Sequence, residues 1–307
     1  MDIDLRAFEV FDDLAERARV AYVVEMDHCT AEKSSFRLAC IRYLASRGWR
    51  WFGEEVDPRI GRRLDRYLTS GDVSLLEPVR DDPWYTSGVL TATAGSAEAI
   101  ALDERLQRDR ARLVQAVRRH VPDARWFGFD IGYDDEEWRA AANSSETFAQ
   151  LNDALALRER ILHARVDEVL AAHPEERVAL LAGSLRLARD DGLVDAPGMT
   201  GPGGGQVPSV GHHVASSIDG PVLSFWFLHG EGRSANPYLP PPGDLRPGKR
   251  SWNAELLQRF DEPVVLRVAE DDEVRTITHM HNLDLRCRLS DQVDGVVFAP
   301  RVTPLAG

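Results

Sequence analysis

Three short apolar segments of the chain end in acidic residues, and a histidine follows the first of them. These residues are Glu25, Asp27, His28, Glu54, Glu55 and Asp130. Carboxylates that lie close together cannot all ionise readily, and they favour the cationic form of a neighbouring imidazole. Such groups can take a proton from water or from a hydroxyl group and return it to a leaving group. The cluster therefore predicts acid–base catalysis.

The spacing of these residues predicts which of them meet. Glu25 and Asp27 are two positions apart, so we expect them on one face of an extended segment. His28 and Glu32 are four positions apart and can meet if the following helix has begun by then. The preference of helix N-termini for acids would account for Glu32. It accounts poorly for charged residues at the ends of three strands, where apolar residues would be cheaper to bury. We therefore interpret the cluster as a functional site in a pocket.

The alternation of predicted helices and strands places this cluster at the edge of a sheet. The ranges 4–18 and 30–47 have apolar residues at helical spacing, and Gly48 ends the second of these helices. Pro58 opens a third helix after the extended segment 49–55. The first 72 residues thus predict helix, strand, helix, strand, helix, which implies a parallel sheet with right-handed crossovers. Open parallel sheets bind ligands beyond the carboxyl ends of their strands.

The rest of the chain extends this pattern. Strands are expected at 21–27, 49–55, 125–132, 177–183, 221–228, 263–268, 274–279 and 294–300, and further helices at about 96–121, 145–173 and 209–217. We predict one α/β domain over 1–307, with a central, mostly parallel sheet flanked by helices and an inserted helical segment at about 73–175. The glycine-rich range 196–206 lacks the ending of a phosphate-binding loop, so it is a lid or a plain connector.

Composition excludes several classes of protein. With 43% apolar residues the chain can bury a large core, and its formal net charge of -13 disfavours nucleic acids and anionic membranes as partners. No apolar run reaches the roughly 20 residues that span a membrane, and the first residues lack a basic leader. The three cysteines show no CxxC spacing, so neither a zinc ribbon nor a redox motif is indicated, and their odd, low number fits a reducing compartment. We expect a cytoplasmic enzyme, monomeric or homodimeric, that acts on a small molecule without a metal or other cofactor.

A few single residues invite other chemistry. Cys29 adjoins His28, but adjacent side chains point apart, so packing is favoured over a nucleophilic role. Lys33 and Lys249 are the only lysines, and Lys33 is the nearer to the cluster, although Schiff-base chemistry is disfavoured. The arginines lie mostly in helical stretches, where a solvated or salt-bridged face is the ordinary explanation.

The ordered set of motifs resembles the erythromycin-esterase-like family, a relative of the haem-uptake/Tiki-type hydrolase group. The first strand of that family ends in Gly-Glu-x-x-His with a glutamate four residues later, and this chain has Glu25, His28 and Glu32 there. The glutamate that ends the second strand of the family corresponds to Glu55, seven residues past Gly48. Other segments that match in order are Leu64–Tyr67, Gly71–Asp72, Gly128–Asp130, Ser209–Val214 and Asp294–Phe298.

The resemblance implies that water opens an ester or a lactone without a serine nucleophile. In that scheme His28 and Glu55 activate the water, and Glu25 orients the imidazole or shares its proton. Glu54, Asp130, Asp27, Glu32 and Arg186 would support them or bind the substrate.

This sequence also departs from the family pattern. The strand at 177–183 leads into two histidines in the family, and Gly183 and Arg186 stand at their positions here, while Val24 replaces the leading glycine of the first motif. Later histidines that could complete the site are His212, His213, His279 and His281. His212 and His213 lie at a predicted helix start, where one faces the pocket or both serve as capping or packing residues.

Three functions remain open on these residues. The first is a metal-independent hydrolase of a natural product. The second is a non-hydrolytic acid–base enzyme of secondary metabolism, a cyclase, dehydratase or lyase, which the missing histidines favour. The third is a metal- or haem-binding module, suggested by the wider superfamily and by His279 and His281, which would share one face of a strand. Hydrogen-bonded or surface histidines are commoner than metal ligands.

Overall fold

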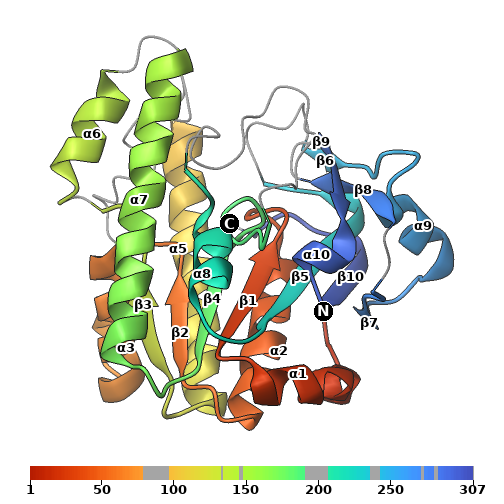
Figure 1. Ribbon diagram of the computed structural model, residues 1–307, viewed down its shortest axis with the longest axis horizontal. Helices are drawn as coiled ribbons and strands as arrows, with labels where there is room; N and C mark the ends of the chain where they lie inside the picture. Colours follow the sequence, from red (N-terminus) through yellow and green to blue (C-terminus); the bar gives the residue numbers. More distant parts are fainter. Residues whose placement is uncertain are drawn as a thin grey trace.

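A computed structural model of the chain (Figure 1) describes residues 1–78, 97–132, 134–144, 148–190, 207–235, 243–270, 273–279 and 283–306. Eight of the described strands form one sheet in the order β3-β2-β4-β1-β5-β10-β7, with β6 paired to β5. Their bounds are β1 Val20–Glu25, β2 Trp51–Glu54, β3 Arg125–Gly128, β4 Val178–Gly183, β5 Val222–Arg233, β6 Asp244–Leu245, β7 Val264–Arg267 and β10 Gly295–Val302. The six strands from β3 to β10 are parallel, and β7 and β6 run antiparallel to their neighbours.

Helices cover both faces of the sheet. The helical elements are η1 Leu5–Phe11, α1 Asp12–Arg17, α2 Glu32–Ser46, α3 Pro58–Ser70, η2 Val73–Leu76, α5 Ala97–His120, α6 Glu136–Asn143, α7 Phe148–Ala172, α8 Val210–Ser217, α9 Trp252–Arg259 and α10 Leu289–Gln292. One core cluster joins η1, α2, α3 and α5 to one face, and a second joins α6, α7, α8 and α10 to the other. In Figure 1, α7 and α8 accordingly lie in front of the sheet and α2 and α5 behind it.

The central strand β1 shows why the sheet needs two layers of helices. All six of its residues are buried. Ala21 and Val23 pack in the first core cluster, whereas Val20, Tyr22 and Val24 pack in the second. This is the two-residue alternation of a strand whose two faces are both apolar. Glu25, the last residue of β1, therefore lies where a strand that is buried on both faces ends.

The turns around β2 follow from local sequence. Gly48 has a φ of +90°, which a residue without a Cβ adopts at little cost, and it ends the segment of α2. Asp57 accepts a hydrogen bond from the backbone N–H of Arg59 and caps α3, whose first residue is Pro58. Gly71, with a φ of +75°, ends α3. The helix boundaries predicted at Gly48 and Pro58 are confirmed.

The predicted fold class, a mostly parallel sheet flanked by helices, is confirmed, with local differences. The helix expected at 4–18 begins as a 3-10 helix, and α6 was not expected. Residues Leu283–Arg288 form β9, which pairs with β8, Val274–His279, in a separate antiparallel hairpin. The expected insertion at about 73–175 contains β3, which lies in the sheet. Whether the chain is one domain stays a prediction, and the loop at 196–206 lies outside the described residues.

Candidate active site

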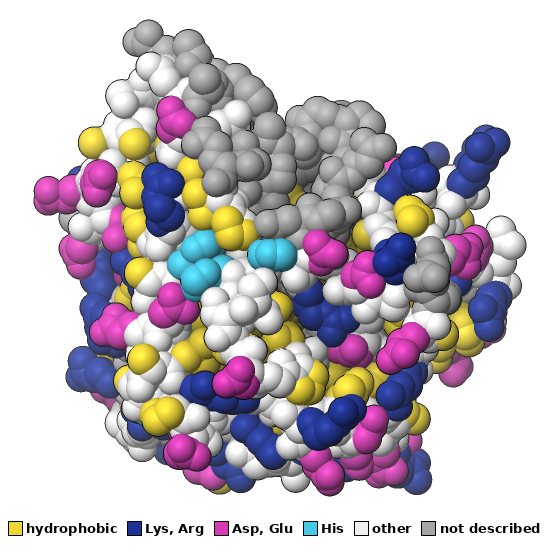
Figure 2. Space-filling view, viewed as in Figure 1, with side chains coloured by type: hydrophobic (Ala, Val, Ile, Leu, Met, Phe, Trp, Pro, Cys, Tyr) yellow, Lys and Arg dark blue, Asp and Glu magenta, His cyan; other side chains and the backbone are white. Residues whose placement is uncertain are grey.

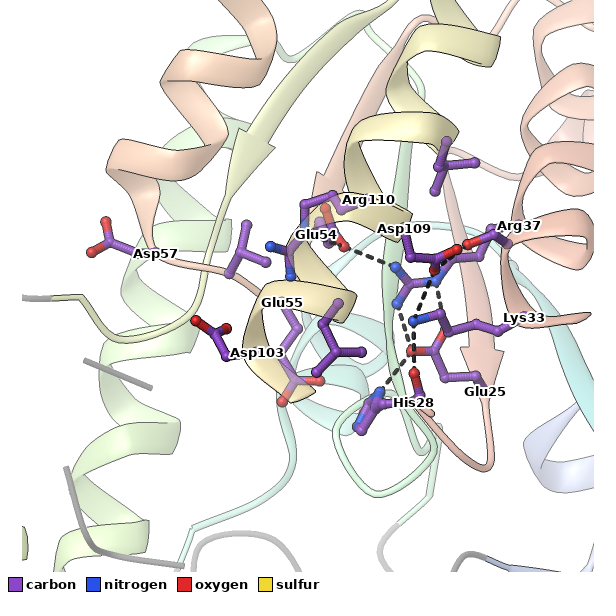
Figure 3. Close-up of a pocket in the computed structure, with 14 residues that line it drawn as sticks. Glu25, His28, Lys33, Arg37, Glu54, Glu55, Asp57, Asp103, Asp109 and Arg110 are labelled. Carbon is purple, nitrogen blue, oxygen red and sulfur yellow. Dashed lines mark hydrogen bonds and ion pairs between the residues drawn. The ribbon is translucent and has the colours of Figure 1, made fainter. Parts of the chain in front are cut away.

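A pocket opens at the carboxyl ends of β1 and β2 (Figure 3). The parallel register brings these ends together, since Glu25 pairs with Gly183 on β4 and Glu54 pairs with Leu181. Most of the lining is charged and comes from β1, β2, α2, α5 and the segments after the strands. It includes Glu25, His28, Lys33, Arg37, Glu54, Glu55, Asp57, Asp103, Asp109 and Arg110. The pocket is therefore suited to polar chemistry.

A buried arginine holds the two acids at the strand ends. Arg37 on α2 donates to both oxygens of Glu25, with Nε–Oε2 at 2.5 Å and Nη2–Oε1 at 2.6 Å, and to Oε1 of Glu54 at 2.8 Å. Arg110 on α5 also donates to Oε1 of Glu54, at 3.0 Å. Burial alone would raise the pKa of Glu25, but the charge of Arg37 and the contact with His28 bring it down to about 2. Glu25 is thus a permanent carboxylate.

His28 lies directly on this carboxylate. Its Nδ1 is 2.7 Å from Oε1 of Glu25, so Nδ1 carries the proton and donates. Burial lowers the pKa of His28, but the hydrogen bond and charge of Glu25 outweigh it, and Glu55 adds to the net rise. Nζ of Lys33 donates to the backbone oxygen of His28 at 2.8 Å and pairs with Asp109 at 3.5 Å. The imidazole side chain is 32% exposed, so its second nitrogen, Nε2, is the one left for a ligand.

Glu55 lies across a small space from His28. Its Oε2 accepts from the backbone N–H of Gly183 at 3.1 Å, and its Oε1 accepts from Arg158 at 3.1 Å and from Arg186 at 3.3 Å. A Cβ atom on Gly183 would be 3.2 Å from Nε2 and Cε1 of His28 and 3.8 Å from Oε2 of Glu55. Imidazole and carboxylate therefore face the same point in front of Gly183. The structure brings Glu25, His28 and Glu55 into one constellation.

A second ion-pair network lies behind Glu55. Asp130, buried beyond β3, accepts from Nε of Arg158 at 2.8 Å and from its Nη2 at 2.6 Å. Arg186 pairs through Nη1 with Glu159 on α7, whose other oxygen accepts from the backbone N–H of Val210. Burial and the neighbouring charge of Arg158 lower the pKa of Arg186 to about 10, so it remains a cation at neutral pH. Asp130 and Glu159 position the two arginines rather than reach the pocket.

Two acids expected beside His28 lie elsewhere. The prediction that Asp27 shares a face with Glu25 is wrong, because β1 ends at Glu25. Oδ1 of Asp27 accepts from the N–H of Cys29 at 2.6 Å and from Oγ of Ser234 at 2.9 Å. The condition for a contact of His28 with Glu32 is not met, because α2 begins only at Glu32. The carboxylate of Glu32 accepts instead from the N–H and Oγ1 of Thr303, both at 2.9 Å, and ties α2 to the segment after β10.

The later histidines do not line this pocket where the structure describes them. Histidine side chains gather on the face seen in Figure 2. Nε2 of His213 lies 2.9 Å from Asp167, and its ring stacks on that of His163 with centroids 4.1 Å apart. His212, the neighbour of His213 on α8, does not line the pocket either. His279 is described only as the last backbone position of β8, and His281 lies outside the described residues. A metal-binding role for that pair stays a prediction.

Of the two explanations expected for helical arginines, a salt-bridged face fits Arg37 and Arg158 and a solvated face does not, because both are buried. A signal for both was present in the sequence. Arg37 is four residues before the buried Ile41, and Arg158 lies midway between the buried Ala154 and Leu162. Charged residues at core spacing on a helix need buried partners of opposite charge. In both helices those partners are the acids at the strand ends.

The described residues show no sign of a reactive cysteine, a metal site or a membrane-spanning helix. Cys29, Cys40 and Cys287 are all buried and free. Burial raises the pKa of Cys29, which keeps it a thiol and fits the packing role. No group of three His, Cys, Asp or Glu side chains in the described part of the chain is arranged to hold a metal ion. None of the described helices is both long and apolar enough to cross a membrane.

Comparisons with known proteins place this geometry in a known fold. No protein-family model and no curated protein sequence matches the chain. Among solved structures, a mutant of the erythromycin esterase EreC in its open conformation aligns with a TM-score of 0.68 at 16% identity, over 100% of this chain and 96% of that one. A Bacillus cereus protein aligns at 0.61 and 13% identity over 99% and 94%, and a succinoglycan biosynthesis protein at 0.62 and 10% over 98% and 92%. The chain therefore has the erythromycin-esterase-like fold that its motifs led us to expect.

Proposed function

We propose that this protein is a hydrolase that opens an ester, a lactone or a related bond of a natural product with water activated by His28. The observation that carries the proposal is the position of the imidazole. Its Nδ1 is bound to a buried carboxylate, 2.7 Å away, and its ring faces the same point as Glu55. A base oriented by a third group, with a second polar group beside it, is the arrangement that acid–base catalysis requires.

The mechanism follows from the two nitrogens of the ring. With Nδ1–H donated to Glu25, the neutral imidazole presents the lone pair of Nε2, which takes a proton from water while the water oxygen bonds to the carbonyl carbon. Glu25 then stabilises the imidazolium. When the tetrahedral intermediate collapses, the bond to the leaving oxygen breaks and Nε2 returns the proton to that oxygen.

Glu55 is suited to orient the water. A carboxylate oxygen has two acceptor directions, and in the described structure Oε2 uses one of them for Gly183. The second can accept a hydrogen from the attacking water. Oε1 already accepts from two arginines, so Oε2 is the oxygen left for the water, and His28 is the base.

The test is hydrolysis of a panel of esters and lactones by the purified protein. The substitution His28→Gln or Glu55→Gln should lower kcat/KM by roughly 10²–10⁴-fold, which is the usual contribution of a general acid–base group. His120→Gln, at the exposed end of α5, is the matched control and should keep wild-type turnover. Wild-type activity in both site variants would contradict the proposal.

One observation favours a second candidate, a cyclase, dehydratase or lyase on the same site. Gly183 and Arg186 stand where the resemblance leads us to expect two histidines, so half of the expected proton-transfer equipment is replaced. His28 alone could then move a proton between two positions of one substrate. Products formed in oxygen-18 water decide between the candidates, since only hydrolysis must incorporate the label.

A further inference from the structure

Arg186 combines a fixed position with a spare hydrogen-bond donor. It follows β4 by three residues, and its Nε donates to Oε1 of Glu55 at 3.3 Å. On the other side its Nη1 pairs with the buried Glu159. The described residues offer no hydrogen-bond acceptor to the third nitrogen, Nη2. The side chain is 14% exposed, so this donor is not sealed in the core.

The planar shape of the guanidinium tells which way Nη2 points. Nε–H and one N–H of Nη2 lie along the same edge of the group, which is why arginine often binds a carboxylate with two parallel bonds. In Arg186 this edge faces Glu55, but only Nε is used, because Arg158 already donates to the same oxygen. The spare N–H therefore lies on the side of Glu55; Glu55 lines the pocket, and Arg186 lies directly behind it.

Contacts within the protein fix the other side of the guanidinium, at Nη1, so no ligand is needed to orient it. Glu159 takes the ion pair from Nη1 and is itself fixed by the N–H of Val210. The backbone N–H of Arg186 donates to the oxygen of Gly183 at 3.0 Å, which sets the turn after β4. Donors fixed in advance stabilise a developing charge better than donors that must reorient during the reaction.

We propose that Arg186 is a catalytic residue that donates from Nη2 to the carbonyl oxygen of the substrate and to the oxyanion formed on it. The inference rests on the proposed hydrolysis. As the water oxygen bonds to the carbon, the π pair of the carbonyl moves to its oxygen, and Nε2 of His28 holds the proton of the water. On collapse the C=O bond re-forms, the leaving oxygen departs, and His28 protonates it. Arg186 neither gains nor loses a proton in these steps.

A histidine at this position would act differently. An imidazole is an ionic donor only below its pKa, whereas the guanidinium keeps its charge through the neutral range. Arg186 therefore makes oxyanion stabilisation independent of pH between about 6 and 8. In an Arg186→His variant the new imidazole must be protonated to make the same contact. Its kcat should therefore fall as the pH rises through the neutral range, in addition to the pH dependence that His28 causes.

The experiment compares wild type, Arg186→Gln and the double variant Arg186→Gln/Glu159→Gln on the best ester of the panel. The double variant is included because Arg186→Gln alone leaves a buried carboxylate unpaired and can unfold. Both variants should lose about 10²–10³-fold in kcat, the worth of one oxyanion donor, with a much smaller change in KM. Arg47→Gln, which breaks an ion pair with Asp12 at the other end of α2, should keep wild-type kcat.

A stable phosphonate analogue of the tetrahedral intermediate gives the second readout. Its affinity should fall in the double variant by about the factor lost in kcat, which a purely structural role of Arg186 would not produce. A folded double variant with wild-type kcat and wild-type phosphonate affinity overturns the role of Arg186 while leaving the hydrolase proposal in place. Absence of hydrolysis by the wild-type protein across the panel overturns both.

Discussion

Replacing the carboxylate under His28 should lower the pKa of the imidazole. In Glu25→Gln the ring loses a negative partner 2.7 Å from Nδ1, and that partner is fully buried. It also gains a repulsive neighbour, because the charge of Arg37 is no longer balanced by the two contacts it makes with Glu25. Both changes favour the neutral imidazole. The folded protein has a raised pKa for His28, so the substitution moves it back toward or below the ordinary value.

The size of the effect follows from the distance and the burial. An opposite charge within about 4–6 Å shifts a pKa by roughly 1–3 units, and each unit is worth about 1.36 kcal/mol. The ring of His28 is about one-third exposed, which weakens the effect of the lost charge without cancelling it, so the pKa of the imidazole falls. Because the base must be neutral, the acidic limb of kcat/KM should move to lower pH by the same amount. The plateau should fall, since a weaker base takes the proton of water less readily.

Nuclear magnetic resonance of 15N-labelled histidine measures this without a known substrate. The protein has nine histidines, and the signal absent from a His28→Gln spectrum identifies His28. In the wild type above its pKa, the pattern should be that of an imidazole protonated at Nδ1. Asp12→Asn is the control, since it also removes a carboxylate bound to an arginine, Arg47, but far from the pocket. Its His28 titration should match the wild type.

Two results would refute this reasoning. An unchanged or higher pKa of His28 in folded Glu25→Gln would mean that Glu25 does not govern the imidazole. A wild-type ring protonated at Nε2 would mean that the lone pair faces Glu25 rather than the pocket, and the proposed base would be lost. A circular dichroism spectrum confirms that each variant is folded before it is titrated.

Three further substitutions test other contacts. Arg37→Met should destabilise the protein by about 3–5 kcal/mol in urea unfolding, because it leaves the buried Glu25 without its arginine and Glu54 with Arg110 alone; a loss under 1 kcal/mol would contradict the network. Gly183→Ala should lower kcat/KM about tenfold with little change in melting temperature, because its Cβ presses on the ring of His28; unchanged kinetics would show that the ring moves freely. Glu32→Ala should keep wild-type turnover and lose about 1 kcal/mol of stability with its bonds to Thr303, so a large loss of turnover would restore Glu32 to the site.

Much of the fold was predictable because its signals are local. Gly48 and Pro58 mark helix ends through backbone geometry that depends on few neighbours. The apolar run of β1 indicates a strand covered on both faces. The strand β9, LDLRCR, was missed although Leu285 and Cys287 alternate with charged residues, because its only strand partner in the described structure is β8. An isolated two-residue alternation is a weak signal when no sheet face covers it.

The acids of the site were predictable from the sequence, whereas the partners of its buried helical arginines were not. Strand ends in a parallel sheet share one edge, so Glu25 and Asp130 could be grouped from their positions alone. That Arg37 points inward depends on acids from two different strands, which only the assembled sheet brings within reach. The prediction for Asp27 was wrong for a simpler reason. The strand expected at 21–27 ends at Glu25, so the side chain of Asp27 no longer follows the alternation of the strand.

Gly183, the last residue of β4, and Arg186, three residues later, act together in the proposed site. Without a Cβ, Gly183 lets the ring of His28 lie beside the end of β4, where a Cβ would be 3.2 Å from Nε2. A histidine restored at that position would fill the space that His28 and Glu55 face and push the catalytic ring out of it. Gly183→His, alone or with Arg186→His, should therefore lose activity and shift the 15N signals of His28. Wild-type turnover in the double variant would show that two imidazoles fit there, and that the glycine and the arginine are not a matched pair.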